Sequence, residues 1–154
     1  MLDSPDECAH EILDVVPLVM RSMRAELRSH RSADLSVPEY RSLALINRRP
    51  GASLSNVAKH LGLTLPSTSK LVDGLVDRQL VTRQLSTSDR RRITLNLTES
   101  GKSVLEASYQ ITRVHFSEVF TRLPEADRAL IIRAMQVLRS IFSTNEALQG
   151  GSGR

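Results

Sequence analysis

Residues 54–101 change from one hydrophobic period to another, and this change limits the folds that are open to the chain. Residues 54–62 and the segment that starts at residue 64 repeat apolar positions every three or four residues, as amphipathic helices do. Residues 80–97 instead alternate apolar and polar positions around a cluster of turn-forming residues, which is typical of a half-buried hairpin. This order predicts two short helices followed by a two-stranded ribbon.

The first predicted helix buries one face, made of Leu54, Val57, Ala58 and Leu61. We expect Ser55 to cap its start and Gly62 to end it in the left-handed conformation. Thr64 is the expected N-cap of the second helix, because Pro66 is tolerated only in a first helical turn. The outward positions near the start of the second helix are small, polar or cationic: Pro66, Ser67, Ser69 and Lys70. Such a set lets a helix sit close to base edges in a major groove.

The predicted hairpin carries positive charge near its turn. Arg83 lies in the first strand, and Asp89, Arg90, Arg91 and Arg92 lie at or beside the turn. Neighbouring arginines repel one another unless an anion is near, and Asp89 offsets only part of this charge. Phosphates would offset the rest, so these residues are candidate DNA contacts.

The positive charge of the chain is concentrated in the same segment. The whole chain has a formal charge of +4 and a sequence pI near 9.8. Residues 54–97 hold seven Lys or Arg and three Asp, so this segment alone accounts for the +4. A solvated charged face could give the same count, but the order of the motifs favours a surface that neutralises phosphates.

Five short motifs follow one another in this segment: Leu54-x-x-Val57-Ala58-x-x-Leu61-Gly62, Ser69-Lys70-Leu71-Val72-Asp73-x-Leu75, Leu80-Val81-x-Arg83, Asp89-x-Arg91 and Leu97-Thr98-x-x-Gly101. In this order they resemble the DNA-binding core of the MarR family of bacterial transcription regulators. The resemblance implies a homodimer whose recognition helices enter successive major grooves of a double-stranded DNA operator, while Arg91 enters or lines the minor groove. Two residues depart from the family pattern, because Gln79 stands where glycine is common and Gly74 falls inside the second helix.

The predicted fold is therefore mainly α with a small β-hairpin wing, a winged helix-turn-helix core flanked by N- and C-terminal dimerisation helices. Pro17 is expected to kink or restart the N-terminal helix, and Ser36 and Glu39 form a capping-box pattern. Apolar residues expected to bury against a second chain are Ile12, Val16, Val119, Leu138 and Phe142. We expect one chain over residues 1–149, with a dimerisation helix at 5–34, a DNA-binding lobe at 36–101, dimerisation helices at 102–144 and a flexible tail at 145–154.

The resemblance also implies a small aromatic or phenolic effector that binds between the dimer helices and the DNA-binding lobe. The candidate contacts are polar residues on otherwise apolar faces: Arg21, His30, Tyr40, Arg41 and His115. Each of them is also explained by a structural role, such as a packed tyrosine or a salt-bridged arginine.

No pattern in the chain indicates catalysis, a metal site or a cofactor. The four histidines form no i, i+4 pair, and one cysteine supplies no zinc-binding set. The longest early apolar run is broken by Pro17 and is too short to span a bilayer. We therefore expect a cytoplasmic protein that is not an enzyme and has no membrane partner.

These observations together predict a homodimeric transcription regulator that leaves a pseudo-palindromic operator when an effector binds. Repression is the favoured sign, because a protein bound over a promoter blocks polymerase without any further contact. Two alternatives stay open. One is a winged-helix module for protein-protein assembly, which the arginine run at residues 90–92 argues against. The other is a redox switch acting through Cys8, which the acidic residues around that cysteine argue against.

Overall fold

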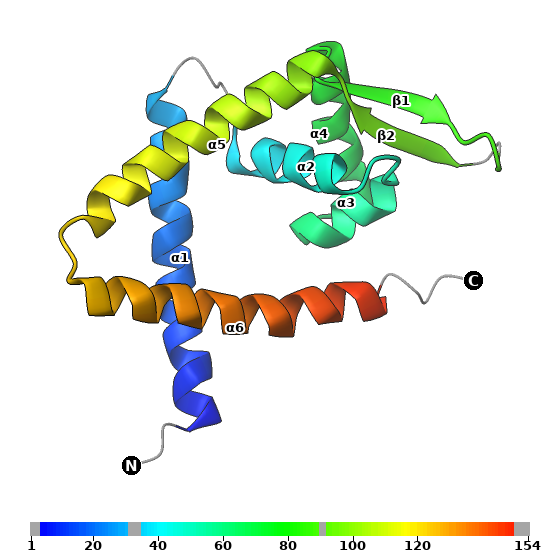
Figure 1. Ribbon diagram of the computed structural model, residues 1–154. Coiled ribbons are helices and arrows are strands. Elements are labelled where there is room, and N and C mark those ends of the chain that lie inside the picture. Colours follow the sequence, from blue (N-terminus) through cyan, green and yellow to red (C-terminus); the bar gives the residue numbers. More distant parts are fainter. Residues whose placement is uncertain (1–3, 31–34, 90–91, 150–154) are drawn as a thin grey trace. The chain divides into compact units, whose positions relative to one another are not determined.

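The computed structural model describes residues 4–30, 35–89 and 92–149, with side-chain surroundings described up to residue 143 (Figure 1). The chain divides into two compact units, Met1–Arg113 and Val114–Arg154. The first unit contains α1 (Pro5–Ser29), α2 (Val37–Arg48), α3 (Leu54–Leu61), α4 (Leu65–Asp77), the strands β1 (Val81–Leu85) and β2 (Ile93–Leu97), and most of α5 (Glu99–Phe120). The end of α5 and α6 (Glu125–Gln149) form the second unit. The prediction of a mainly helical fold with one hairpin is confirmed.

The helix starts follow the capping residues in the sequence, with one exception. At α2 the Ser36 N–H donates to the Glu39 carboxylate over 2.7 Å, and this box ties down the first turn as predicted. Thr64 caps α4, also as predicted. The expectation that Ser55 caps α3 is wrong. Ser53 takes that role, because its hydroxyl accepts from the Asn56 N–H while the Asn56 side chain accepts from the Ser53 N–H.

Two positive backbone φ angles end α3 and α4. Gly62 ends α3 at φ 67°, the left-handed conformation that glycine adopts without a steric cost. After α4, Gln79 adopts φ 57°, and this is the residue that replaces the glycine common in the MarR pattern. The backbone therefore keeps the left-handed turn even though the residue that favours it is absent.

Helix α1 runs through Pro17 without interruption, so the expected restart at this residue does not occur. A proline removes one intrahelical hydrogen bond, and the helix nevertheless continues from Pro5 to Ser29. Ser4 and Glu7 form a capping box that fixes the start of the helix.

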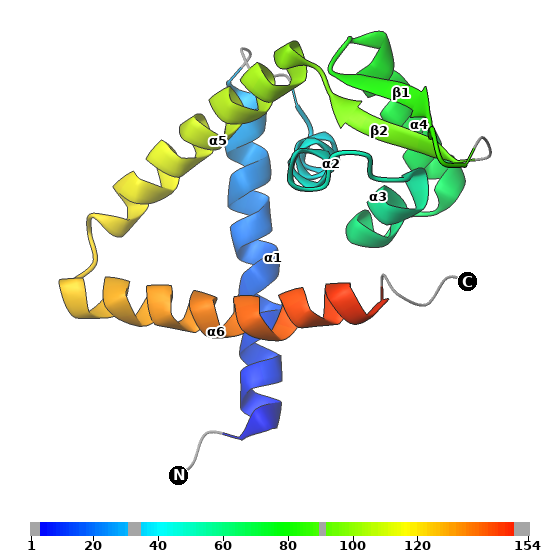
Figure 2. The same cartoon turned by 45° about the vertical axis from the view of Figure 1, so that its right-hand side comes forward.

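The core of the first unit lies where α2, α3, α4 and the hairpin meet. Its fully buried side chains include Leu43, Ile46, Val57, Val72, Leu75 and Leu95. The strands are antiparallel, with Val81 opposite Leu97 and Leu85 opposite Ile93. Strand β2 is also bonded to the loop between α2 and α3, because the Leu95 N–H donates to the Ala52 carbonyl over 2.8 Å and the Gly51 N–H donates to the Leu95 carbonyl over 3.0 Å. The root of the hairpin is thereby fixed to the helices, and the hairpin extends away from them (Figures 1 and 2).

The start of α5 packs directly on the backbone that enters the hairpin. The Thr98 N–H donates to the Leu80 carbonyl over 3.1 Å, and the Thr98 hydroxyl donates to the Gln79 carbonyl over 2.6 Å. The Gly101 N–H in turn donates to the Thr98 hydroxyl, so Thr98 caps α5 as the sequence predicted. The residues that precede β1, the residue that follows β2 and the first turn of α5 are thus joined by hydrogen bonds.

Several helices leave large apolar side chains exposed. On α1 these are Leu13, Val15, Val16, Leu18 and Val19. In the second unit, which is a helix end followed by α6, they include Val119, Leu130, Ile132, Ile141 and Phe142. Within the part of the chain that the structure describes, no helix has the length and apolar character needed to cross a membrane.

Candidate nucleic-acid interface

The N-terminal half of α4 presents the small, polar face that the sequence predicted. Pro66, Ser67 and Lys70 are exposed and Ser69 is half-buried. The opposite face is anchored, because Thr68, Val72 and Leu75 are buried in the core. This helix is therefore held firmly by one side and presents short side chains and one ammonium group on the other.

Hydrogen bonds at the start of α4 fix the local geometry. The Thr64 hydroxyl accepts from the Ser67 N–H over 3.3 Å and lies 3.0 Å from the Ser67 hydroxyl, to which it donates. The Thr68 hydroxyl donates back to the Thr64 carbonyl over 2.8 Å. The first turn is thus ordered by its own side chains, and the partial positive charge of a helix N-terminus favours nearby anions.

The structure pairs Arg83, a candidate DNA contact, with an acidic residue on α4. Its guanidinium lies 2.5 Å from the Asp73 carboxylate, and both side chains are partly exposed. Asp73 follows Ser69 by four residues and Lys70 by three, so it extends the same helix face. The ion pair therefore joins the hairpin to the exposed face of α4.

The turn of the hairpin is described in part. The Ser86 N–H donates to the Arg92 carbonyl over 2.7 Å, and the Arg92 N–H donates to the Asp89 carbonyl over 3.0 Å. The side chains of Asp89 and Arg92 are exposed. Arg90 and Arg91 lie outside the described residues, so their predicted contacts stay predictions from the sequence.

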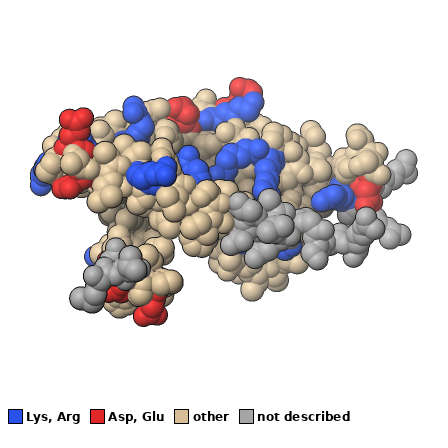
Figure 3. Space-filling view, turned by 60° about the horizontal axis from the view of Figure 1, so that its bottom comes forward, with Lys and Arg blue, Asp and Glu red and all other residues tan. Residues whose placement is uncertain are grey.

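On the one face that Figure 3 shows, the charged side chains of the described residues do not form one continuous patch. On the face that Figure 3 draws, Lys and Arg side chains lie in several groups with uncharged surface between them. Arg41 is one cation that is already engaged within the fold, because its guanidinium donates to the His60 carbonyl at the end of α3 over 2.8 Å. A count of cations along the chain therefore overstates the charge that is free for a ligand.

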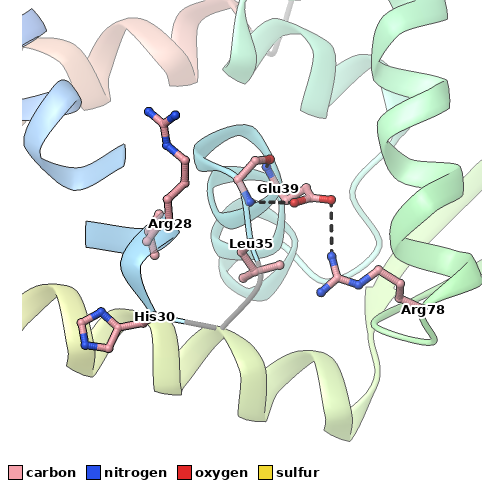
Figure 4. A pocket seen from close by; sticks show the side chains of 7 residues that line it. Arg28, His30, Leu35, Glu39 and Arg78 are labelled. Carbon is pink, nitrogen blue, oxygen red and sulfur yellow. Dashed lines mark hydrogen bonds and ion pairs between the residues drawn. The ribbon is translucent and has the colours of Figure 1, made fainter. Parts of the chain in front are cut away.

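A pocket of about 650 Å³ lies where the end of α1, the start of α2 and the end of α4 meet (Figure 4). Its lining combines aliphatic and charged side chains: Leu27, Arg28, His30, Leu35, Ser36, Glu39 and Arg78. Glu39 lies 3.5 Å from the Arg78 guanidinium while it also accepts the Ser36 N–H. Its carboxylate is thus shared between a helix cap and an ion pair.

Of the candidate effector contacts, His30 is the one that lines this pocket. Its ring lies 3.2 Å from the Glu26 carboxylate. Arg21 is exposed on α1, and Tyr40 and Arg41 follow on α2. His115 belongs to the second unit and contacts the Phe116 ring edge-on, with centroids 5.6 Å apart. The structure therefore does not gather these candidates into one site within either unit.

Tyr40 is half-buried, and burial raises the pKa of its phenol above the ordinary value of 10.0. The neighbouring Tyr109 and Glu106 add to the rise in this pKa, while Arg48 opposes it. Tyr40 is thus a neutral, partly packed phenol at ordinary pH. The sequence analysis did not select Tyr109. Tyr109 follows the buried Leu105 by four residues, so the two residues lie on the same side of α5.

The other pocket residues were also missed by sequence reasoning. Arg28, Glu39 and Arg78 come from three helices that are far apart in the chain, so no local motif joins them. One indication of the pocket was present in the sequence, because Glu39 was already recognised as a capping residue at the start of α2. Among the described residues, no cluster of three or more His, Cys, Asp or Glu has the arrangement needed to hold a metal ion.

A helix pair with an exposed second helix, followed by a hairpin and tied to it by an ion pair, defines a winged helix-turn-helix protein. Residues 35–93 match the sequence model of the MarR family. The matched segment is similar to the DNA-binding part of this family, whose members are transcription regulators and not enzymes.

Curated relatives and solved structures of this family resemble the chain over most of its length. The HTH-type transcriptional repressor IacR of Pseudomonas putida is 29% identical over 118 residues, which cover 77% of this chain and 69% of IacR. The uncharacterized regulator YfiV of Bacillus subtilis is 26% identical, and the match covers 68% of this chain and 66% of YfiV.

Two solved structures share the fold. Mycobacterium tuberculosis Rv2887 in complex with p-aminosalicylic acid has a TM-score of 0.70 at 22% identity, covering 84% of this chain and 96% of that one. Streptococcus pneumoniae FabT in complex with DNA has a TM-score of 0.68 at 20% identity, covering 92% of this chain and 99% of that one. At these identities the likeness concerns the fold.

Proposed function

We propose that this chain is a homodimeric repressor that binds a pseudo-palindromic operator and leaves it when a small aromatic acid or phenol binds. The observation that carries the proposal is the exposed face of α4, which is small, polar and cationic and is joined to the hairpin by the Asp73–Arg83 pair. A helix of this kind beside a cationic ribbon matches the two grooves of a DNA duplex.

In this proposal, α4 is the recognition helix. Pro66, Ser67, Ser69 and Lys70 meet base edges and nearby phosphates in the major groove. The hairpin is the wing, with Asp89, Arg90, Arg91 and Arg92 at its turn beside the backbone or minor groove. Arg83 acts mainly through Asp73 and is the weakest of the proposed DNA contacts, because its charge is already partly compensated.

The exposed apolar helices support a dimer. Side chains on α1 and α6 that one chain leaves in water include Val16, Ile132 and Phe142. Apolar surface of this extent is usually covered by a partner, and a two-fold copy is the commonest partner. Residues 5–34 and 102–144 then form the dimer, and residues 36–101 form the DNA-binding lobe. A dimer places two recognition helices about one helical turn of DNA apart.

The pocket between α1, α2 and α4 suits an aromatic acid. Leu27 and Leu35 offer apolar surface for a ring, while Arg28 and Arg78 offer guanidinium groups for a carboxylate. The structure of Rv2887 contains p-aminosalicylic acid, which has this chemistry. A carboxylate bound to Arg78 would compete with Glu39, the residue that also caps α2. Ligand binding would thus be linked to the start of α2.

The proposal, which places the protein in the cytoplasm, is tested by mapping the genomic DNA that it binds. The mapping is done either in cells or with purified protein and fragmented genomic DNA. DNA fragments captured by the full chain are expected to share a two-fold symmetric sequence within promoters, and a transcription template carrying it is expected to be silenced. Addition of salicylate at millimolar concentration should release the fragments. Capture of DNA without a shared sequence would contradict the operator, and activation of the template would contradict repression.

A further inference from the structure

One face of the hairpin runs from buried to exposed apolar residues. Side chains alternate between the two faces of a strand, so three opposed pairs share this face: Val81 with Leu97, Arg83 with Leu95, and Leu85 with Ile93. The first two pairs include Val81 and Leu95, which are buried in the core. At the distal pair, Leu85 is 67% exposed and Ile93 is 46% exposed. We call Leu85 and Ile93 the distal apolar pair.

The Asp73–Arg83 contact shows which way this face is turned. Arg83 lies on the same face as the distal apolar pair, and its guanidinium reaches Asp73 on α4. Asp73 in turn shares the exposed face of α4 with Ser69 and Lys70. The distal apolar pair therefore lies on the side of the hairpin that is turned toward the exposed face of α4. A DNA duplex bound at that face of α4 would lie on the same side of the hairpin as Leu85 and Ile93.

The charge beside the pair limits what can cover it. Arg92 directly precedes Ile93 and is exposed, and it ends a run of three arginines in the sequence. Two wings brought together would place these runs side by side, which like charges oppose. The partner must therefore present negative charge and apolar surface within a few ångströms of each other. The DNA backbone does so, because its phosphates alternate with the C–H surfaces of deoxyribose.

We propose that Leu85 and Ile93 pack against deoxyribose groups along the minor groove, as an apolar contact of the wing that adds to its arginines. This rests on the proposed function, and it assigns affinity to residues that carry no charge. In other architectures, proteins that bind the minor groove insert leucine or isoleucine between base steps, so aliphatic side chains are compatible with this groove. An apolar contact releases no counterions, so its contribution is independent of salt concentration.

The test compares variants of the full chain on one probe, a fluorescent duplex that the wild-type protein selects from a random-sequence pool. Leu85→Thr with Ile93→Thr removes apolar surface while keeping residues that favour strands. Gln84→Thr is the matched control, because Gln84 lies on the other face of the same strand and is also exposed. Arg92→Ala supplies the ionic comparison.

The double threonine variant is expected to bind the probe about tenfold or more weakly, with an unchanged slope of affinity against salt. Arg92→Ala should instead lower that slope by about one unit. Hydroxyl-radical cleavage of the bound probe, which reports exposed deoxyribose, should increase at the wing positions in the double variant alone. The Gln84→Thr control should leave affinity, slope and cleavage as in the wild type.

The outcomes separate this inference from the function on which it rests. If the wild-type chain selects no duplex, the proposed function fails. If it selects one and the double variant binds it with wild-type affinity, the distal apolar pair does not contact DNA. A lower salt slope in the double variant would show that the substitutions had displaced the cationic residues of the wing from the phosphates. A changed sedimentation coefficient would show that the distal apolar pair contacts another chain. Either result would overturn the inference.

Discussion

Gly101 lies against the backbone of Leu80 so closely that a Cβ atom on Gly101 would be 2.1 Å from the Leu80 carbonyl oxygen. The same carbonyl accepts the Thr98 N–H, so it cannot turn away without losing a hydrogen bond. This explains why the sequence ends its MarR-like segment with Thr98-x-x-Gly101. The threonine caps α5, and the glycine lets that helix start against the root of the hairpin.

Gly101→Ala is therefore expected to destabilise the chain by about 1–3 kcal/mol or more, because backbone atoms rather than a flexible side chain must shift. Urea denaturation measures the change. Gly74→Ala is the matched control, because nothing lies within 4 Å of a Cβ placed there. Within α4, that alanine should stabilise the helix by up to about 1 kcal/mol. Equal stability of the two variants would contradict the close approach.

Gln79→Gly should stabilise the chain. Gln79 holds a left-handed conformation at φ 57°, which costs a non-glycine residue about 1–2 kcal/mol, and part of this gain is offset by the greater freedom of glycine in the unfolded chain. A net gain of roughly 0.5–1 kcal/mol in the free energy of unfolding is expected. The expectation is wrong if the midpoint of urea denaturation falls.

Asp73→Asn should change DNA binding more than stability. The ion pair with Arg83 is solvent-exposed, with 34% and 53% of the side chains accessible, so the pair contributes only about 0.2–1 kcal/mol to folding. Removing the carboxylate leaves Arg83 uncompensated and takes a negative charge off the exposed face of α4. Binding to random duplex DNA should tighten, with a salt slope steeper by up to about one unit. An unchanged slope would mean that Arg83 stays away from phosphates.

Lys70→Ala tests the reading of sequence by α4. Lys70 is exposed on the face with Ser67 and Ser69, so loss of a base contact should cost about 1–3 kcal/mol and relax the preference at one position in each half-site. Affinities for a set of single-base operator variants give the answer. A uniform loss across all of them would assign Lys70 to a phosphate instead.

Phe142→Glu tests the dimer. Phe142 is 56% exposed in the single chain, so a charge there should leave the fold of the protomer intact. Sedimentation should show a monomer, and operator binding should weaken sharply while salt-sensitive binding to any DNA persists. A wild-type chain that is monomeric at micromolar concentration and still binds its operator tightly would refute the dimer.

Local sequence patterns predicted the helix pair and the hairpin because the residues that decide them are neighbours in the chain. Thr64, Gly62 and the box of Ser36 with Glu39 act within one turn, and all were anticipated. Ser55 was chosen over Ser53 because both can cap, and only the reciprocal bond with Asn56 decides between them.

Contacts between distant residues could not be predicted in the same way. Arg83 was expected to meet DNA, yet its nearest acidic partner lies on a different element, and the pairing depends on how the hairpin packs on α4. The pocket residues Arg28, Glu39 and Arg78 meet only because three helix ends converge. Gly101 was recognised as part of a motif, but the need for glycine at this position comes from its close approach to the Leu80 backbone.

The hydrogen bonds of Leu95 to Gly51 and Ala52 attach the hairpin to the loop that follows α2. The hairpin is therefore expected to move together with that loop. The loop that is hydrogen-bonded to β2 follows the end of α2. The start of α2 is capped by Glu39, which also lines the pocket. A ligand that tilts α2 by a few degrees would swing the turn of the hairpin through a larger arc, because that turn lies at the far end of the strands. In the proposed function, a ligand that displaces the Glu39 carboxylate from Arg78 would in this way misalign the hairpin with a DNA groove.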